Sequence, residues 1–544
     1  MKRPLLAVEL LVLLVSLFLV ASANGPFWRA LLAGRNLADA ATWRFGAALF
    51  VALVALHFAV LCLLATRCIV RPMLALLLVA SAAAAHFIQR YGVVLDPSML
   101  RNILHTDPRE AAELLSFDLL GSVLLFGLIP ASLLWAVRPA TRPLGQTLIL
   151  RSVAVTVAMG VAVGAMLLAY QDFSSLMRNQ PSLRYTLTPG NIAWSLMRVL
   201  AGDARAAIAA RDPPDPAQRS LATSGGRKPV LLVMVIGETA RAANFSLNGY
   251  ARQTNPELAQ LEVINFGHAT ACGTSTEVSL PCMFSPYGRA DYDEARIRRH
   301  ESLLHLLARA GMRVAWLDNQ SGCKGVCDGL EFHDLGKQKI PGLCADGHCY
   351  DEVLLQGLRS VLETSGGDRV VVLHQLGNHG PAYYRRYPPE MKRFTPVCES
   401  AEFRDCTREQ IVNAYDNAIL YTDRFLAQTI RYLSDLQARF DVALLYVSDH
   451  GESLGERGLY LHGLPYAIAP REQLEVPMLW WLPQGSARGL NVDLACLRRR
   501  AGEKASHDNL FHSVLGLLAV ATPGYRQERD LFESCRTPYV AAAH

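Results

Sequence analysis

The segment TACGTSTEVSLPCMF places two cysteines, Cys272 and Cys282, on either side of three hydroxyl side chains, those of Thr274, Ser275 and Thr276. A free threonine is a poor nucleophile, because its proton is held too tightly near neutral pH, but a bound metal ion can generate the alkoxide. Such chemistry needs the hydroxyl fixed to within about 0.5 Å. The two cysteines therefore suggest a loop that holds a nucleophile in place, and an ordinary stapled loop is the alternative.

Four further polar side chains follow apolar, β-rich runs of the sequence. VMVIG runs into Glu238, LLYVS runs into Asp449 and His450, and VVVLHQLGN runs into His379. Two carboxylates with an imidazole suit a divalent transition ion, and the hydroxyl of Thr276 would complete four-coordination. Each residue alone has an ordinary explanation, because polar residues commonly end strands. Their combination indicates a site at which a metal ion activates a hydroxyl and neutralises a phosphoryl oxygen.

The elements that must position these side chains alternate between strand and helix. Apolar runs predict strands at 229–237, 313–318, 369–376, 442–449 and 476–482. Between them, residues 409–437 carry apolar side chains at helical spacing. Strands buried on both faces and joined by helices predict an α/β domain around a mostly parallel central sheet. Ligands in such sheets bind beyond the carboxyl ends of the strands, which is where the candidate residues lie.

The N-terminal part of the chain has a different character. The sequence is 51% hydrophobic, with a mean hydropathy of +0.18, and five apolar stretches lie at roughly 4–23, 45–65, 70–88, 118–136 and 151–170. Each has about 20 residues, the length that crosses a bilayer. The first could be mistaken for a signal peptide, but its long apolar core and the four stretches after it indicate a retained span.

These patterns divide the chain into three parts. We expect a five-helix transmembrane domain at 1–170, a linker and bridging segment at 171–228 and a catalytic domain at 229–544. Ten of the twelve cysteines lie after residue 270, several in close pairs, which favours disulfides in an oxidising compartment. Five spans that start in the cytoplasm place the catalytic domain outside, in agreement with the cysteines. The sequence alone does not show which thiols pair.

Net charge excludes one class of partner. The formal charge of +5 is mild for 544 residues, and no basic cluster interleaved with aromatic residues is present. No nucleic-acid partner is therefore expected.

Six segments of the sequence carry a family resemblance. They are VIGETARAANFSLNGYARQTNP, ACGTSTEVSLPCMF, DNQSGCKGVCD, GNHGPAYYRRYPP, VSDHGESLGERGLYLHGLPYAIAP and SHDNLFHSVLG. Together they resemble the phosphoethanolamine transferases that modify lipid A, members of the alkaline phosphatase/sulfatase-like superfamily. The resemblance covers nearly the whole chain, because five spans followed by a periplasmic catalytic domain is that family's layout.

The resemblance implies roles for the residues already singled out. Thr276, the second threonine of CGTST, would be the nucleophile. Glu238 of GET, with Asp449 and His450 of SDHGE, would bind the family's zinc ion together with Thr276. One Zn²⁺ is expected to bind tightly, and the resemblance allows a second.

Further residues match positions of the family that contact substrate. His379 of NHGP and His462 of LHGLPYA resemble residues that handle the phosphoryl group or a second zinc, and Lys324 of GCKGVC resembles a substrate contact. The stretch YGVVLDPSMLRNILHTDPREAAELL resembles the family's periplasmic loop between spans three and four. Three of its residues fall at i, i+4 and i+8, on one face of a helix: Asn102, Thr106 and Glu110. The resemblance implies that they approach a lipid headgroup. The alternative is that they simply form the polar face of an interfacial helix.

The family's disulfides agree with three of the cysteine spacings. These pairs are Cys272/Cys282, Cys323/Cys327 and Cys398/Cys406. Cys344/Cys349 lies in a region that varies in the family, and a bridge between Cys496 and Cys535 is a hypothesis without family support.

The function implied by the resemblance is transfer of phosphoethanolamine from phosphatidylethanolamine to lipid A phosphates through a phosphothreonine-type intermediate. The protein would be a monomer in the bacterial inner membrane, with its catalytic domain in the periplasm. A less anionic outer surface would then confer resistance to polymyxin and other cationic peptides. Two alternatives stay open: the same chemistry on a core sugar, glucan or protein, and a membrane sensor that binds anionic phosphates without catalysis.

Overall fold

The computed structural model describes residues 3–33, 35–106, 108–179, 181–208, 212–219, 228–345, 347–363 and 366–537. Its contacts divide the chain into two compact units. Unit 1 comprises Met1–Arg101 and Leu115–Leu200, and unit 2 comprises Asn102–Leu114 and Ala201–His544. The three-part division expected from the sequence, with boundaries at residues 170 and 228, stays a prediction. Unit 2 holds the candidate site, and it includes a short segment contributed from within the membrane half of the sequence.

Unit 1 is helical. Its longer helices are α1 (Val8–Ser22), α2 (Gly25–Leu32), α3 (Ala40–Leu64), α4 (Val70–Tyr91), α8 (Ile129–Ala136) and α9 (Leu144–Asn179). Helix α8 is the last part of a longer helical segment. That segment begins with α7 (Phe117–Val123) and passes through the π-helical turn η1 (Leu124–Leu128). Within the described residues, four helical segments are long and apolar enough to cross a membrane, and the bent pair α1 and α2 would make a fifth. Many of their large apolar side chains are exposed, as lipid-facing residues are.

The first predicted span differs from the expectation. The apolar stretch is helical only from Val8 to Ser22, and the chain then turns by 58° into α2. Asn24 sits at the break, where its buried amide donates to the carbonyls of Leu19 and Thr188. Its side chain thereby joins the end of α1 to a backbone carbonyl 164 residues further along the chain. The expected linker also contains more helix than expected, because α9 continues to Asn179 and α10 spans Gly190–Ile208.

Unit 2 is built on a seven-stranded sheet. Its order is β5 (Ile264–Asn265), β16 (Met478–Trp481), β12 (Asp441–Ser448), β4 (Val230–Gly237), β11 (Arg369–His374), β7 (Arg313–Asp318) and β8 (Glu331–Asp334). The strands from β12 to β8 are parallel to their neighbours, whereas β16 and β5 pair antiparallel. The mostly parallel sheet predicted from the sequence is thus confirmed, and β5 and β8 are short strands that the hydrophobic pattern missed.

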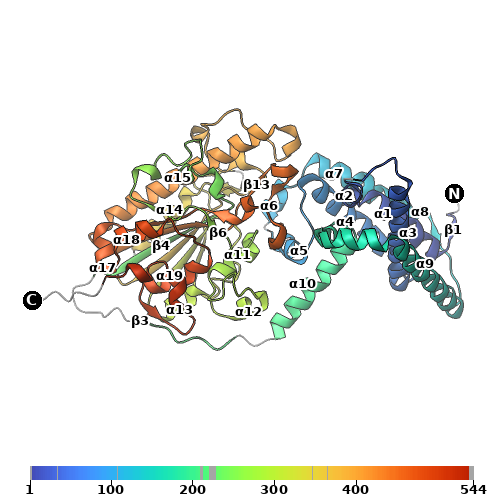
Figure 1. Ribbon diagram of the computed structural model, residues 1–544, viewed down its shortest axis with the longest axis horizontal. Coiled ribbons are helices and arrows are strands. Elements are labelled where there is room, and N and C mark those ends of the chain that lie inside the picture. Colours follow the sequence, from blue (N-terminus) through green and yellow to red (C-terminus); the bar gives the residue numbers. More distant parts are fainter. Residues whose placement is uncertain are drawn as a thin grey trace, which may run out of the picture. The chain divides into compact units, whose positions relative to one another are not determined.

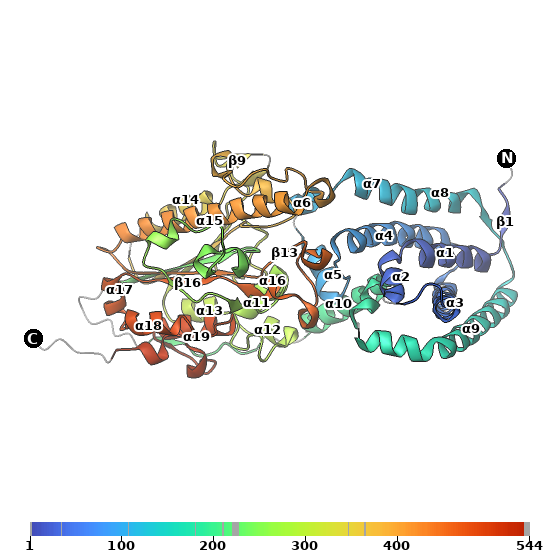
Figure 2. The same ribbon diagram turned by 45° about the horizontal axis from the view of Figure 1, so that its top comes forward.

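Helices cover both faces of this sheet (Figures 1 and 2). One face carries α14 (Glu352–Glu363) and α15 (Arg408–Asp435), and the other carries α13 (Leu303–Arg309) and α19 (Asp508–Leu517). All residues of β4, β11 and β12 are buried, which explains why their sequences are continuous apolar runs rather than alternating ones. The long helix α15 begins with a capping box formed by Thr407 and Gln410.

Five disulfides lie in unit 2. They join Cys272–Cys282, Cys323–Cys327, Cys344–Cys349, Cys398–Cys406 and Cys496–Cys535. These are the close pairs noted in the sequence, together with the bridge across 39 residues that was only a hypothesis. Cys62 and Cys68 of unit 1 are free thiols.

Candidate active site

The register of two parallel strands places the candidate metal ligands together. Ser448, the last residue of β12, pairs with Gly237, the last residue of β4, so the residues that follow leave the sheet at the same edge. Glu238, Asp449 and His450 each offer a ligand atom, and these atoms lie within 4.8 Å of one another. All three side chains are buried.

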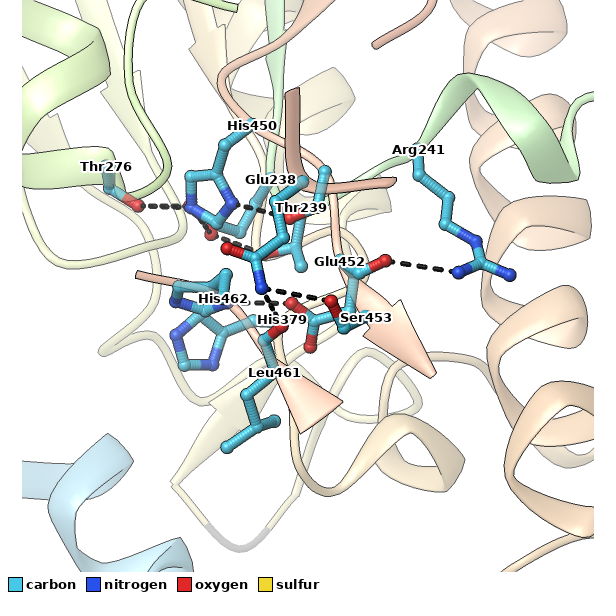
Figure 3. A network of polar contacts seen from close by, with 12 residues as sticks. Glu238, Thr239, Arg241, Thr276, His379, His450, Glu452, Ser453, Leu461 and His462 are labelled. Carbon is cyan, nitrogen blue, oxygen red and sulfur yellow. Dashed lines mark hydrogen bonds and ion pairs between the residues drawn. The ribbon is translucent and has the colours of Figure 1, made fainter. Parts of the chain in front are cut away.

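Thr276 completes this cluster from another element (Figure 3). It is the first residue of α11 (Thr276–Met283), where the positive end of the helix dipole favours negative charge. Its hydroxyl donates to Glu238 Oε2 at 3.0 Å and lies 3.4 Å from His450 Nε2. The structure therefore brings together the hydroxyl, both carboxylates and the imidazole that the sequence singled out.

Thr239 holds the two carboxylates in place at the cost of an unusual backbone. Its φ is +60°, a region that β-branched residues rarely adopt. Its N–H donates to Asp449 Oδ1 at 3.1 Å, and its hydroxyl donates to Glu238 Oε1 at 2.6 Å. Its carbonyl accepts from the Tyr415 hydroxyl at 2.7 Å. Three hydrogen bonds thus maintain a strained residue between the two candidate ligands, as functional sites often do.

The electrostatics of the cluster call for a positive charge between the carboxylates. Burial disfavours the charge on Asp449 and, together with the negative charge of Glu238, raises its pKa. Burial also opposes ionisation of Glu238, but the hydrogen bond and charge of His450 lower the Glu238 pKa overall. Against the effect of its own burial, His450 has its pKa raised to about 10 by Asp449 and Glu238. A divalent cation would meet the same demand.

Two further observations fit the site to a cation. Among the described residues, the buried oxygen Asp449 Oδ2 accepts no hydrogen bond, and His450 Nε2 lies 3.4 Å from it as an ion-pair partner. His450 donates through Nδ1 to the carbonyl of Gly451 at 2.9 Å, which leaves the lone pair of Nε2 directed toward the carboxylates when the ring is neutral. Two buried carboxylates, an imidazole nitrogen and a hydroxyl form a donor set suited to zinc.

A second group of histidines lies next to this cluster (Figure 3). The ring centroid of His462 is 4.3 Å from that of His450 and 5.9 Å from that of His379. His462 Nδ1 lies 2.8 Å from Glu452 Oε2, and the hydroxyl of Tyr383 donates to the other oxygen of the same buried carboxylate. Glu452 thus fixes the orientation of the His462 ring and favours a proton on Nδ1, which makes Nε2 the accepting nitrogen of the neutral ring.

Two glycines allow the loops of the site to approach closely. Gly377, two residues before His379, has φ +53°, and a Cβ there would lie 2.8 Å from the carbonyl oxygen of Glu238. A Cβ on Gly451 would lie 2.1 Å from the carbonyl oxygen of Glu472. Only glycine fits at these positions without moving the residues beside them.

Lys324 does not contact the cluster directly. Its ammonium donates to Ser321 Oγ at 2.8 Å and to the Ser321 carbonyl at 3.1 Å. The same loop reaches the cluster through Gln320, whose amide donates to Glu238 Oε2 at 3.1 Å. The predicted substrate contact of Lys324 stays a prediction.

The helical argument for residues 102–110 is wrong. The helix α5 (Pro97–Leu104) ends before Thr106, and α6 (Pro108–Glu113) begins a new helix, so Asn102 and Thr106 do not share one continuous helical face. Pro108 explains the break, because proline cannot continue a preceding helix but fits at the first position of the next. The Thr106 hydroxyl donates to the Asn102 carbonyl at 2.7 Å. The side chain of Glu110 lies outside the described part of the chain.

His507 links the nucleophile loop to the end of β12. The N–H of Cys272 donates to His507 Nδ1 at 3.1 Å, and His507 Nε2 donates to the carbonyl of Ser448 at 2.9 Å. Burial, and then the charge of His450, lower the His507 pKa to about 4 although its bond to Ser448 opposes this. The ring is therefore neutral at physiological pH, as its accepting Nδ1 requires.

Sequence reasoning missed several of these supporting residues. Glu452, Thr239 and Gln320 lie within a few residues of a candidate ligand or cysteine, and His507 lies in a segment that carried the family resemblance. That proximity was the available signal. Their partners lie far away in the sequence, so the roles follow only from the folded structure.

The fold and site are those of the alkaline phosphatase/sulfatase class. Residues 231–520 match the sulfatase family model, and residues 53–204 match the model described as phosphoethanolamine transferase EptA/EptB. Phosphoethanolamine transferase EptA of Salmonella typhimurium strain LT2 is 39% identical over 98% of this chain and 98% of its own length. Phosphatidylethanolamine transferase Mcr-1 of Escherichia coli is 37% identical over 87% of this chain and 89% of its own.

Solved structures agree with these sequence matches. The integral membrane lipooligosaccharide phosphoethanolamine transferase A of Neisseria meningitidis superposes with a TM-score of 0.94, at 36% identity, over 98% of this chain and 100% of its own. The chain therefore belongs to the phosphoethanolamine transferase EptA family. It is an integral membrane enzyme with a periplasmic catalytic domain, as the sequence predicted.

Acid should destabilise the fold through His507. A histidine whose pKa is lower in the folded than in the unfolded state contributes stability above its unfolded pKa of about 6.5, and this is lost as pH falls toward about 4. We expect a loss of at most about 3 kcal/mol in unfolding free energy over this range. Melting temperatures of the detergent-solubilised protein from pH 7.5 to 4.5 measure it. His507→Gln should melt lower at pH 7.5 with a flatter pH profile, whereas the exposed control His268→Gln should follow the wild type.

Glu452→Gln should slow phosphoethanolamine transfer by about 10- to 100-fold, the effect typical of removing a carboxylate that orients a functional histidine. Glu456→Gln is the matched control, because Glu456 neighbours it in sequence and pairs with Arg241 and Arg408 instead. The control should keep a rate close to that of the wild type. Equal losses in both variants, with lowered melting temperatures, would show that Glu452 acts only on stability.

Proposed function

We propose that this protein transfers phosphoethanolamine from phosphatidylethanolamine to a phosphate group of lipid A, with Thr276 as the nucleophile. The observation that carries the proposal is the contact of the Thr276 hydroxyl with Glu238 and His450 inside a buried carboxylate–imidazole cluster. The relatives support the two lipids: Mcr-1 is named a phosphatidylethanolamine transferase, and a more distant Escherichia coli relative acts on Kdo(2)-lipid A.

The reaction has two steps. In the first, Thr276 Oγ1 forms a bond to phosphorus, the bond from phosphorus to the glycerol oxygen breaks, and that oxygen takes up a proton as diacylglycerol leaves. In the second, an oxygen of the lipid A phosphate attacks the phosphorus, the bond to Oγ1 breaks, and the threonine hydroxyl regains its proton. His462, oriented by Glu452, is placed to hold or move a proton at Nε2, with His379 beside it.

Glu238, Asp449, His450 and Thr276 would hold a zinc ion in this site. Zinc would lower the pKa of the threonine hydroxyl and neutralise charge on the phosphoryl group. His379 and His462 are the residues available to a second ion. The apolar helices of unit 1 keep the catalytic unit at the membrane that contains both lipids, which raises its effective concentration there.

Two alternatives make different predictions. The same chemistry on a core sugar, glucan or protein would leave lipid A unmodified. A sensor that only binds phosphates would need no nucleophile, and the complete cluster around Thr276 disfavours it.

Mass spectrometry of lipid A tests the proposal. A Gram-negative host that lacks its own phosphoethanolamine transferase would express either the wild-type protein or the Thr276→Ala variant. The control is Thr274→Ala, which removes another hydroxyl from the same loop. We expect one or two added phosphoethanolamine groups, and raised polymyxin resistance, with the wild type but not with Thr276→Ala. A modification that survives in Thr276→Ala would exclude this residue as nucleophile. Unmodified lipid A in cells with well-expressed wild type would instead point to another acceptor.

Metal removal tests the zinc site separately. The purified protein should contain about one tightly bound zinc per chain by elemental analysis, and a chelator should remove both the metal and the transfer activity. Added Zn²⁺ should restore both. Asp449→Asn should lower the zinc content even before activity is measured, whereas His462→Gln should keep the tightly bound ion. Full zinc content in Asp449→Asn would contradict this assignment of ligands.

A further inference from the structure

Residues 102–114 contact two parts of unit 2, the loop of His379 and the helix α11 that begins with Thr276. The segment is contributed from within the membrane half of the sequence, between Arg101 and Leu115 of unit 1, yet it groups with the catalytic unit. It comprises the end of α5 and the short helix α6. Figures 1 and 2 show α6 among the elements of that unit.

One end of the segment is held by a buried ion pair. The Arg386 guanidinium donates through Nη2 to Glu113 Oε2, and the side chains of Glu113 and Arg386 are only 3% and 1% exposed. His348 Nε2 lies 3.3 Å from the other oxygen of Glu113. Burial opposes the charge of Glu113, but Arg386 outweighs it and lowers the Glu113 pKa. Glu113 is therefore a buried carboxylate whose charge depends on a partner from another element.

The same arginine holds the loop of His379. Arg386 Nε donates to the backbone carbonyl of His379 at 2.6 Å. One guanidinium thus connects the carboxylate of α6 to the backbone of a residue at the active site. Because the planar guanidinium fixes the directions of its N–H groups, the positions of Glu113 and His379 are geometrically linked.

The other end of the segment contacts the helix of the nucleophile. His105 Nδ1 lies 3.1 Å from Glu277 Oε1, and Glu277 directly follows Thr276 in α11. The same oxygen accepts from Arg298 Nη2 at 2.7 Å. The Glu277 carboxylate is buried but His105 is half-exposed, so this contact is weaker than that of Glu113 and Arg386.

We propose that Glu113 and Arg386 are positioning residues for the transfer reaction. Their pair clamps residues 102–114 onto the loop of His379, so that Asn102 and Thr106 and the catalytic residues face one lipid headgroup as a single rigid unit. The proposal rests on the proposed function, because a lipid phosphoethanolamine headgroup is the ligand that the segment would help to bind. Neither residue touches the reacting atoms. Loss of the pair displaces the segment and His379 together.

A double-mutant cycle on the full-length protein in phosphatidylethanolamine nanodiscs tests this coupling. The variants are Glu113→Gln, Arg386→Gln and the double variant, and the readout is the rate at which phosphoethanolamine appears on Thr276, followed by mass spectrometry of the intact protein. Each single variant should be about 100-fold slower than the wild type, as a misplacement of about 1 Å produces. The double variant should be no slower than either single one, because both remove the same contact.

Hydrogen–deuterium exchange separates positioning from general stability. In both single variants, exchange should increase in the backbone of residues 102–106 and 377–380 while the strands of the sheet stay protected. Asp530→Asn is the matched control, because it removes a buried carboxylate that pairs with Arg536 at 2.9 Å. The control should lower the melting temperature without faster exchange in residues 102–106 and with a rate on Thr276 close to that of the wild type.

Two results would overturn the inference. Rate losses that multiply in the double variant would show that Glu113 and Arg386 act independently. Unchanged exchange in residues 102–106 would show that the pair does not hold the segment. If the wild type itself gains no phosphoethanolamine on Thr276, the proposed function fails instead, and the exchange measurement still decides whether the clamp exists.

Discussion

The structure of the catalytic unit depends on two carboxylates that are forced together in a buried place. The parallel register of β4 and β12 brings Glu238 and Asp449 to one sheet edge, where no water screens their repulsion. Positive charge beside the two carboxylates stabilises this arrangement; His450 supplies part of it, and a bound cation would add to it.

The groups that hold the cluster in place come from several loops at this edge of the sheet. Thr239 fixes both carboxylates through a strained backbone, Gln320 reaches Glu238 from the loop after β7, and His507 connects the nucleophile loop to β12. The Cys272–Cys282 bridge closes the loop that presents Thr276. Preorganisation of this kind is what phosphoryl transfer needs, because the reaction depends strongly on the position of the reacting groups and on the charge around them.

The membrane half of the sequence contributes to both units of the structure. The membrane half supplies the helices that retain the enzyme at the bilayer, and it supplies the segment that carries Asn102 and Thr106 into the catalytic unit. In sequence the segment belongs to the membrane half, because both of its ends continue into unit 1, whereas its contacts group it with the catalytic unit.

The sequence by itself predicted the apolar helices, five of the seven strands of the sheet and the candidate residues Glu238, Thr276, Asp449 and His450. Apolar length and period are local properties, and strand ends mark the site edge of a parallel sheet. Only the tertiary structure decided the direction of β16 and the pairing of Cys272 with His507 and of Glu113 with Arg386. These depend on contacts between residues far apart in the chain, which no local pattern records.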